Sequence, residues 1–105
     1  MKSIYNKEGV TVVIPCLNEQ GTLPLVLAKL NDLRGKINRE LEVIVSDNGS
    51  TDRSAAIATE MGARVVPCPT RGYGAALKQG IRSATHEFVL FADADNTTTS
   101  CRFLS

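Results

Sequence analysis

The sequence has no tryptophan, and aromatic residues make up only 5% of its 105 positions. This scarcity argues against an aromatic platform on which the bases of a nucleic acid would stack. An excess of one charge is also missing, because 12 Lys and Arg residues balance 11 Asp and Glu residues and no long basic block occurs. We therefore expect no nucleic acid among the partners of this chain.

Cysteines and long apolar runs are equally scarce. The three cysteines, Cys16, Cys68 and Cys101, show no Cys-x-x-Cys spacing and no histidine cluster, which argues against a zinc site or a disulfide framework. Reduced thiols in a cytoplasmic protein are the simplest interpretation. No run approaches the roughly 18 apolar residues that span a bilayer, and the first residues lack the apolar core of a signal peptide. We expect no transmembrane segment in this chain.

The sequence does have a regular alternation of strand and helix signals. β-branched and apolar runs predict four strands, and apolar residues at helical spacing predict three helices between them. The predicted strands cover residues 10–14, 41–45, 63–66 and 87–92, and the predicted helices cover 23–35, 50–62 and 74–84. This order predicts an α/β fold of three layers, with a mostly parallel sheet between helices, in one domain over residues 1–105.

Two carboxylates, Asp93 and Asp95, follow the fourth predicted strand directly. Side chains two residues apart lie on the same side of extended backbone, so both acids can meet one cation. Oxygen ligands of this kind suit Mg²⁺ or Mn²⁺, and such an ion could hold a diphosphate. The alternative is that both acids only form a turn, since Asn96 and three threonines follow.

Other polar segments follow the first and second predicted strands, at the edge where parallel α/β sheets bind ligands. Asn18 and Glu19 can hydrogen-bond a base or ribose, or simply belong to a solvated loop. Asp47 can accept hydrogen bonds from a nucleoside. One hydroxyl in the pair Ser50 and Thr51 is expected to cap the second helix, and Asp52 to complement the dipole of that helix.

Glycines open the third predicted helix, where close backbone approach and the helix N-terminus favour phosphate. Arg71 and Lys78 can pair with a diphosphate there, although Lys78 fits an ordinary exposed helical lysine as well. A dinucleotide-binding Gly-x-Gly-x-x-Gly motif is not matched, because the third glycine is missing and the segment follows the third strand. We expect the single histidine, His86, to lie at the surface without a role.

Together these segments resemble the nucleotide-sugar-binding half of family 2 glycosyltransferases, which have the GT-A fold. The resemblance covers residues 9 to 100, and its branch includes dolichyl- and polyprenyl-phosphate sugar transferases. The matching motifs are Pro15-x-x-Asn18-Glu19, Asp47-Asn48-Gly49-Ser50-Thr51-Asp52, Arg71-Gly72-x-Gly74-Ala75-Ala76-Leu77 and Asp93-Ala94-Asp95. The resemblance implies a strand order of 3-2-1-4.

The resemblance also implies roles for these residues. Pro15, Asn18, Glu19 and Asp47 would line the nucleoside pocket, and the acids at 93 and 95 would be the metal motif, with Asp95 the more direct ligand. The implied reaction is inverting, metal-assisted transfer from a UDP- or GDP-linked sugar in cell envelope biogenesis. The acceptor would include a polyprenyl phosphate, which would place the full-length enzyme at the cytoplasmic face of a membrane.

The sequence departs from the family at one position and stops early. Asn48 stands where a second acid often follows the first, so Asp47 is the single carboxylate of that turn. The family's catalytic domain is longer, so we expect an amino-terminal fragment without the catalytic base or acceptor site, which folds poorly or associates and transfers no sugar alone. A non-catalytic nucleotide-binding module and a dinucleotide-binding oxidoreductase fragment are the alternatives.

Overall fold

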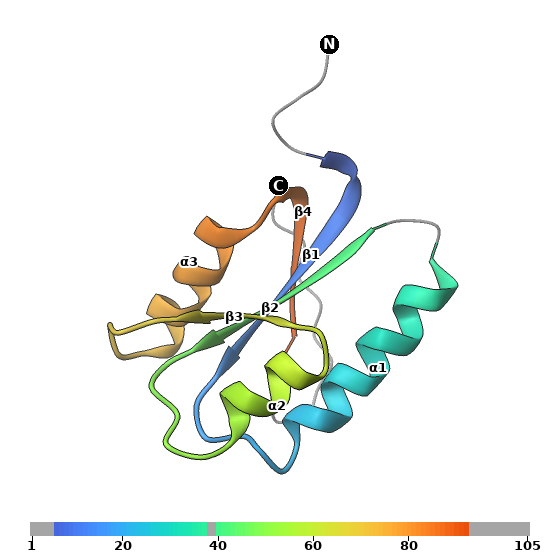
Figure 1. The fold of residues 1–105 in the computed structure, drawn as a ribbon. Helices are drawn as coiled ribbons and strands as arrows, with labels where there is room; N and C mark the ends of the chain where they lie inside the picture. The colour runs from blue at the N-terminus through green and yellow to red at the C-terminus, as the bar shows by residue number, and fades with distance from the viewer. Residues whose placement is uncertain (1–5, 38–39, 93–105) are drawn as a thin grey trace.

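The structure, a computed structural model, describes residues 6–37 and 40–92. Four parallel strands form one sheet in the order β3-β2-β1-β4, which confirms the predicted fold class and strand order. The elements are β1 (Asn6–Cys16), α1 (Leu23–Lys36), β2 (Leu41–Asp47), α2 (Ser54–Glu60), β3 (Arg64–Pro67), α3 (Tyr73–Ser83) and β4 (His86–Phe91). Helices α1 and α2 cover one face of the sheet, and α3 covers the other (Figure 1).

The larger core lies between the sheet and helices α1 and α2. Alternate residues of β1 and β2, such as Val12 and Val43, face this side and pack with the apolar stripe of α1. Leu23 and Leu27 of that stripe are 0% and 2% exposed. Since burying a leucine side chain contributes about 1.5–3 kcal/mol, this stripe is what fixes α1 to the sheet.

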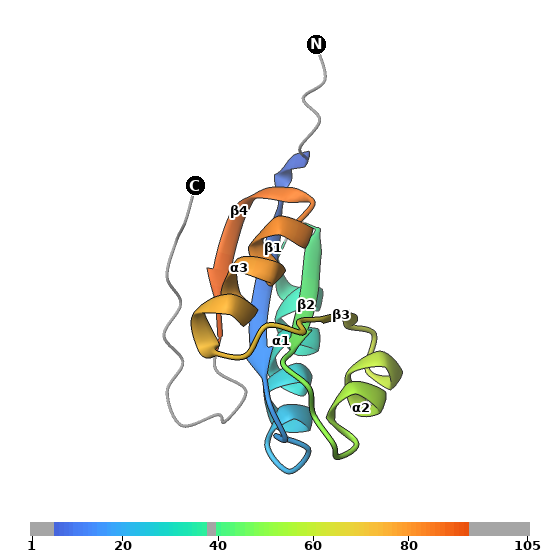
Figure 2. The same cartoon turned by 90° about the vertical axis from the view of Figure 1, so that its left-hand side faces the viewer.

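The opposite face of the sheet carries α3, which lies unusually close to β1 (Figure 2). A Cβ atom built on Gly80 would overlap the side chain of Val13. Only a glycine at this point of the helix therefore allows the observed approach. Because α3 begins at the carboxyl end of β3, this close packing also fixes the position of its first turn.

Several element boundaries differ from the sequence-based prediction. Strand β1 continues through Pro15 to Cys16, and β2 continues to Asp47, so this acid is the last residue of the strand rather than part of the turn. The hydroxyl cap predicted at Ser50 or Thr51 is wrong: α2 begins at residue 54, and its N-cap residue makes no side-chain capping bond. The Ser50 hydroxyl instead accepts a hydrogen bond from the neighbouring loop.

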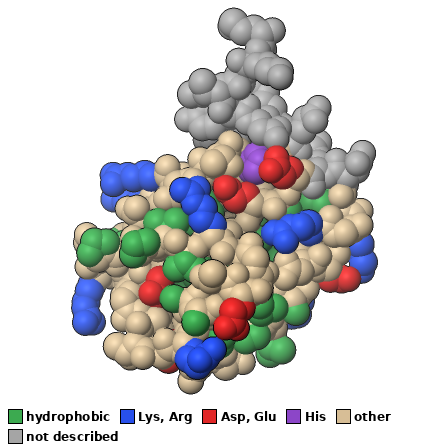
Figure 3. All heavy atoms as spheres, in the orientation of Figure 1, with side chains coloured by type: hydrophobic (Ala, Val, Ile, Leu, Met, Phe, Trp, Pro, Cys, Tyr) green, Lys and Arg blue, Asp and Glu red, His purple; other side chains and the backbone are tan. Residues whose placement is uncertain are grey.

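The prediction for His86 is also wrong, because its side chain is 4% exposed. Its Nδ1 atom lies 3.0 Å from the hydroxyl of Thr11, and its Nε2 atom lies 3.4 Å from a carboxylate oxygen of Glu40. The ring occupies the space that a side chain at Gly9 would fill. Figure 3 shows the histidine beside acidic side chains at the upper end of the molecule. A glycine distant in sequence therefore makes room for this buried ring.

None of the helices in the described ranges is long and apolar enough to cross a membrane.

Candidate functional site

Three loops follow the carboxyl ends of β1, β2 and β3 and lie at the same end of the sheet, because the strands are parallel (Figure 1). They comprise residues 17–22, 48–53 and 68–72. Backbone hydrogen bonds join their beginnings, from the amide of Asn48 to the carbonyl of Cys16 at 2.9 Å and from the amide of Cys68 to the carbonyl of Asp47 at 2.8 Å. We call these loops, with Cys16 and Asp47, the carboxyl edge.

Asn18 connects the first two loops of the carboxyl edge. Its side-chain oxygen accepts hydrogen bonds from the backbone amides of Thr51 at 2.8 Å and Asp52 at 3.3 Å. Its own backbone amide donates to the hydroxyl of Ser50 at 2.9 Å. The φ angle of Asn18 is +52°, a left-handed conformation that asparagine adopts more readily than most residues. Asn18 was predicted to contact a nucleoside, and in the structure its side-chain oxygen holds the second loop.

A second group of contacts extends this connection. The amide of Glu19 donates to the Ser54 hydroxyl at 2.9 Å, and the amide of Gln20 donates to Asp52 at 3.2 Å. The Ser54 hydroxyl in turn donates to Asp52 at 2.6 Å, and this bond lowers the pKa of the Asp52 carboxyl, with backbone amides adding to the effect. The Glu19 carboxylate is half-buried and accepts from Thr22 at 3.2 Å. Several hydrogen bonds thus hold the first two loops together.

Asp47 stands at the centre of the carboxyl edge. Its side chain is half-buried, and one carboxylate oxygen accepts from the amide of Ser50 at 3.2 Å. Beside it lies Cys16, which is 2% exposed. Burial raises the pKa of the Cys16 thiol, and the negative charge of Asp47 adds to the rise, although hydrogen bonds with Ser54 and the Glu19 backbone oppose it. Cys16 is therefore a neutral residue beneath the site, and not a thiolate nucleophile.

The third loop is attached through the side chain of Asn48. Its amide nitrogen donates to the backbone carbonyls of Thr70 at 2.8 Å and Cys68 at 3.2 Å, and its oxygen accepts from the amide of Gly72 at 3.0 Å. Arg71 lies inside the held segment and is exposed. Asn48 therefore holds Arg71 at the same edge of the sheet as Asp47, where the sequence predicted it. In the sequence, Asn48 was notable only as a departure from the family.

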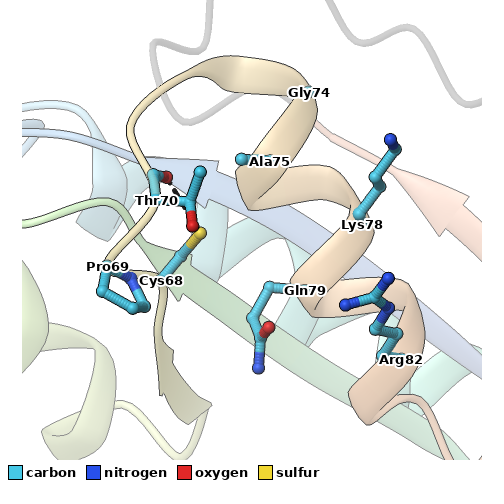
Figure 4. A pocket seen from close by; sticks show the side chains of 8 residues that line it. All are labelled: Cys68, Pro69, Thr70, Gly74, Ala75, Lys78, Gln79 and Arg82. Carbon is cyan, nitrogen blue, oxygen red and sulfur yellow. Dashed lines mark hydrogen bonds between the residues drawn. The ribbon is translucent and has the colours of Figure 1, made fainter.

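Lys78 is exposed on α3, the helix that follows the third loop. It lines a pocket of about 420 Å³ between this helix and the third loop (Figure 4). The pocket is lined by Cys68, Pro69, Thr70, Gly74, Ala75, Lys78, Gln79 and Arg82. None of the other predicted nucleotide-binding residues is among them. Asp47 is likewise not among the residues that line this pocket.

The remaining predicted residues are Pro15, Asp93 and Asp95. Pro15 is buried near the end of β1, level with Ser46 of β2. The two acids lie outside the described residues. The amide of Ala92, the last described residue, donates to the carbonyl of Val13 at 3.1 Å, three residues before the end of β1. Among residues 6–37 and 40–92, no three His, Cys, Asp or Glu side chains group closely enough to hold a metal ion.

Ser54 is a site residue that the sequence analysis missed. Its side chain is 0% exposed and links Glu19 to Asp52. One local signal existed, because the Asp52 carboxylate accepts from the amide of Ser54 two residues on, at 2.9 Å, as in an Asx turn. The contact with Glu19 spans 35 residues of sequence, and no local pattern predicts it.

The sequence of these strands and loops matches a known family of enzymes. The profile of "Glycosyl transferase family 2" matches residues 11–101. The chain belongs to this glycosyltransferase family. The match includes every predicted site residue, from Pro15 to Asp95.

Characterised and uncharacterised relatives support this assignment. An uncharacterized glycosyltransferase of Mycobacterium tuberculosis (strain ATCC 25618 / H37Rv) is 43% identical over 90 residues, which are 86% of this chain and 38% of the relative. The undecaprenyl-phosphate 4-deoxy-4-formamido-L-arabinose transferase of Pectobacterium atrosepticum is 34% identical over 95 residues, covering 84% of this chain and 29% of that protein. The chain thus spans between a quarter and two fifths of the length of these relatives.

Solved structures share the fold. Glucosyl-3-phosphoglycerate synthase from Mycobacterium tuberculosis, in complex with Mn²⁺, UDP and glucosyl-3-phosphoglycerate, superposes with a TM-score of 0.73 at 31% identity, over 83% of this chain and 33% of that one. Mannosyl-3-phosphoglycerate synthase from Rubrobacter xylanophilus gives a TM-score of 0.78 at 23% identity, over 87% and 32% of the two chains. The second likeness concerns the fold alone.

Proposed function

We propose that this chain forms the nucleotide-sugar-binding part of an inverting glycosyltransferase that uses a UDP- or GDP-linked sugar and Mg²⁺ or Mn²⁺. The observation that carries the proposal is the position of Asp47, which is half-buried at the carboxyl edge between two loops that are hydrogen-bonded to each other. The solved relative at 31% identity contains UDP and Mn²⁺. Its likeness to this chain over the same fold supports a nucleotide donor here.

Asp47 and Glu19 are the proposed nucleoside contacts. A carboxylate accepts hydrogen bonds only, so each can receive the N–H of a base or the hydroxyl of a ribose. Pro15 and Asn18 then shape the nucleoside pocket rather than supply its strongest contacts. The side-chain oxygen of Asn18 is already used by two backbone amides, and Pro15 is buried in the strand.

Arg71 is the proposed partner of the diphosphate, because its guanidinium is exposed at the carboxyl edge and matches two phosphate oxygens at once. Lys78 remains a proposed phosphate contact that would need a donor long enough to reach the α3 pocket. Asp93 and Asp95 are the proposed metal ligands, since carboxylate oxygens suit Mg²⁺ and Mn²⁺. A cation held there would offset the charge that develops on the departing diphosphate.

The proposed acceptor carries a phosphate group, and a polyprenyl phosphate is its first candidate. The name of the Pectobacterium relative states a polyprenyl-phosphate acceptor, whereas the mycobacterial structure contains a phosphoglycerate product. A phosphate oxygen is anionic at neutral pH, so it would need little help from a general base in attacking the sugar. A lipid acceptor would also place the enzyme at the cytoplasmic face of a membrane, as part of cell envelope biogenesis.

Calorimetry tests the proposal. The chain should bind UDP or GDP in the presence of Mn²⁺, and Asp47→Asn should weaken this binding by at least about tenfold, because a hydrogen bond to a charged acceptor is lost. Asp32→Asn is the matched control: this acid is exposed on α1 and pairs with Lys36 at 3.0 Å, away from the carboxyl edge.

Three results would speak against the proposal. Nucleotide binding that needs no metal, and that Asp95→Ala leaves unchanged, would favour a non-catalytic nucleotide-binding module. A preference for NAD would favour an oxidoreductase fragment. Equal effects of the substitutions at Asp47 and Asp32 would remove Asp47 from the nucleoside site.

A further inference from the structure

The side chain of Asn48 uses all of its hydrogen-bonding groups within one short segment. Its nitrogen donates to the carbonyls of Thr70 and Cys68, at 2.8 and 3.2 Å, and its oxygen accepts from the amide of Gly72 at 3.0 Å. The three partners are backbone atoms of the loop between β3 and α3. Since two carbonyls require donors and one amide requires an acceptor, the partners themselves determine which end of the side-chain amide faces which atom.

Only an asparagine satisfies this arrangement. An aspartate has the same shape, but it would place an acceptor against two carbonyl oxygens and could keep only the bond from Gly72. The carbonyl of Cys68 would lose this donor, and the carbonyl of Thr70 would keep only the weaker bond from the Cys68 thiol at 3.2 Å. Asn48, which stands where the family resemblance implies a second acid, therefore has a different task in this chain.

The held segment contains the groups that are proposed to meet the diphosphate. Arg71 lies between Thr70 and Gly72, so both of its neighbours in sequence are hydrogen-bonded to Asn48. Gly72 is the N-cap residue of α3 and has a φ angle of +121°, which few other residues adopt. Asn48 itself follows Asp47 directly in the sequence. One side chain thus sets the position of Arg71 and of the first turn of α3 relative to Asp47.

We infer that Asn48 is a positioning residue of the donor site: it fixes Arg71 and the start of α3 so that they face the diphosphate of a nucleotide whose nucleoside is held at Asp47. This inference rests on the proposed function and extends it to a residue that would not itself touch the ligand. A merely structural role would instead stabilise the whole fold, with no special connection to Arg71.

A double-mutant cycle separates these two roles. UDP affinity in the presence of Mn²⁺ is measured by calorimetry for the 105-residue chain, for Asn48→Asp, for Arg71→Ala and for the double variant. Each single substitution should weaken UDP binding by about tenfold. If Asn48 acts through Arg71, adding Asn48→Asp to Arg71→Ala should cost less than about twofold more, because the positioned group is already absent.

Asn31→Asp is the control for the chemical change. The Asn31 amide also bridges two groups, since it donates to the carbonyl of Met61 at 3.2 Å and accepts from Arg34 at 2.9 Å. It lies on α1, on the other face of the sheet from α3. Asn31→Asp should leave UDP affinity unchanged. A second measurement needs no variant: hydrogen exchange of the Gly72 amide in the wild-type chain should be slow.

The possible outcomes test the proposed function and the role of Asn48 separately. Wild-type chain that is folded and monomeric but binds no UDP would overturn the proposed function, and this inference with it. UDP binding that Asn48→Asp leaves unchanged would overturn the inference alone. The inference would also be overturned if the loss of UDP affinity in the double variant equalled the product of the two single losses. Exchange of the wild-type Gly72 amide at the rate of an unfolded peptide would overturn it as well.

Discussion

Several polar side chains at the carboxyl edge make hydrogen bonds to the backbone of a neighbouring loop. Asn18 and Ser54 connect the first two loops, and Asn48 connects the second to the third. Asp47 differs from them, because only one contact, from the amide of Ser50, uses its carboxylate among the described residues. An acid with remaining acceptor positions at the end of a strand is suited to a ligand, whereas the hydrogen-bonded amides around it are suited to fixing its position.

Asp52 offers a test of these contacts at the scale of one residue. The Ser54 hydroxyl, and the amides of Ser54 and Gln20, lower the pKa of Asp52 in the folded protein. Because the folded pKa is lower than the unfolded value of about 3.9, the contribution of Asp52 to stability is present above that value and is lost as the pH falls through the folded pKa. Ser54→Ala removes the largest cause, so the pKa of Asp52 should rise.

An NMR titration of the Asp52 carboxyl carbon measures this shift. Ser83→Ala is the control, because the Ser83 hydroxyl donates to the carbonyl of Gln79 on α3 and has no contact with the first two loops. This control should leave the Asp52 titration where it was. An Asp52 midpoint that stays the same in Ser54→Ala would show that the hydroxyl does not hold the carboxylate.

At the scale of elements, the position of α3 depends on its contact with β1. Gly80→Ala would place a methyl group against Val13, so the helix must move outward or the valine must leave its rotamer. We expect a loss of about 1–3 kcal/mol in the free energy of unfolding, measured by urea denaturation. Gly35→Ala is the matched control: it is also helical, but a Cβ there meets no atom within 4 Å. This control should be neutral or stabilising, by up to about 1 kcal/mol. Equal stability of the two variants would contradict the close approach.

The elements were largely predictable from the sequence, since β-branched runs and helical spacing are local signals. All four strands and three helices occur in the predicted order. The start of α2 was not predictable, because Ser50 resembles a cap but its hydroxyl serves Asn18, 32 residues away in sequence. The burial of His86 was missed for the same reason, since it depends on Thr11 and on the space left by Gly9. Long-range contacts decide such positions, and one local window does not contain them.

The site was predictable to a similar degree. Motif order placed Asn18, Glu19, Asp47 and Arg71 at one edge of the sheet, where the structure has them. It did not show that Asn18 is a connector between loops, or that Lys78 lines a pocket between α3 and the third loop. The roles predicted for Asp93 and Asp95 remain predictions, because both acids lie outside the described residues.

At the scale of the whole molecule, the two ends of the sheet differ in kind. Near the amino ends of the strands, the Thr11 hydroxyl donates to Glu42 at 2.9 Å and lies against His86, while Glu42 also faces Arg64 at 3.7 Å. These contacts join residues of all four strands. At the other end, helix starts and loops converge around Asp47. The parallel sheet thus has one end joined by polar contacts between its strands and one end suited to a ligand.

The most direct test of this account locates the metal. Mn²⁺ added with UDP should broaden the NMR signals of amides at the carboxyl edge first, including Asn48 and Gly49, because the proposed nucleotide would hold the paramagnetic ion beside Asp47. Asp95→Ala should abolish this selective broadening. Broadening that centres on the exposed acids of α1 instead, or that persists unchanged in Asp95→Ala, would contradict the claim that Asp47, at the end of β2, and the acids after β4 share one nucleotide and one cation.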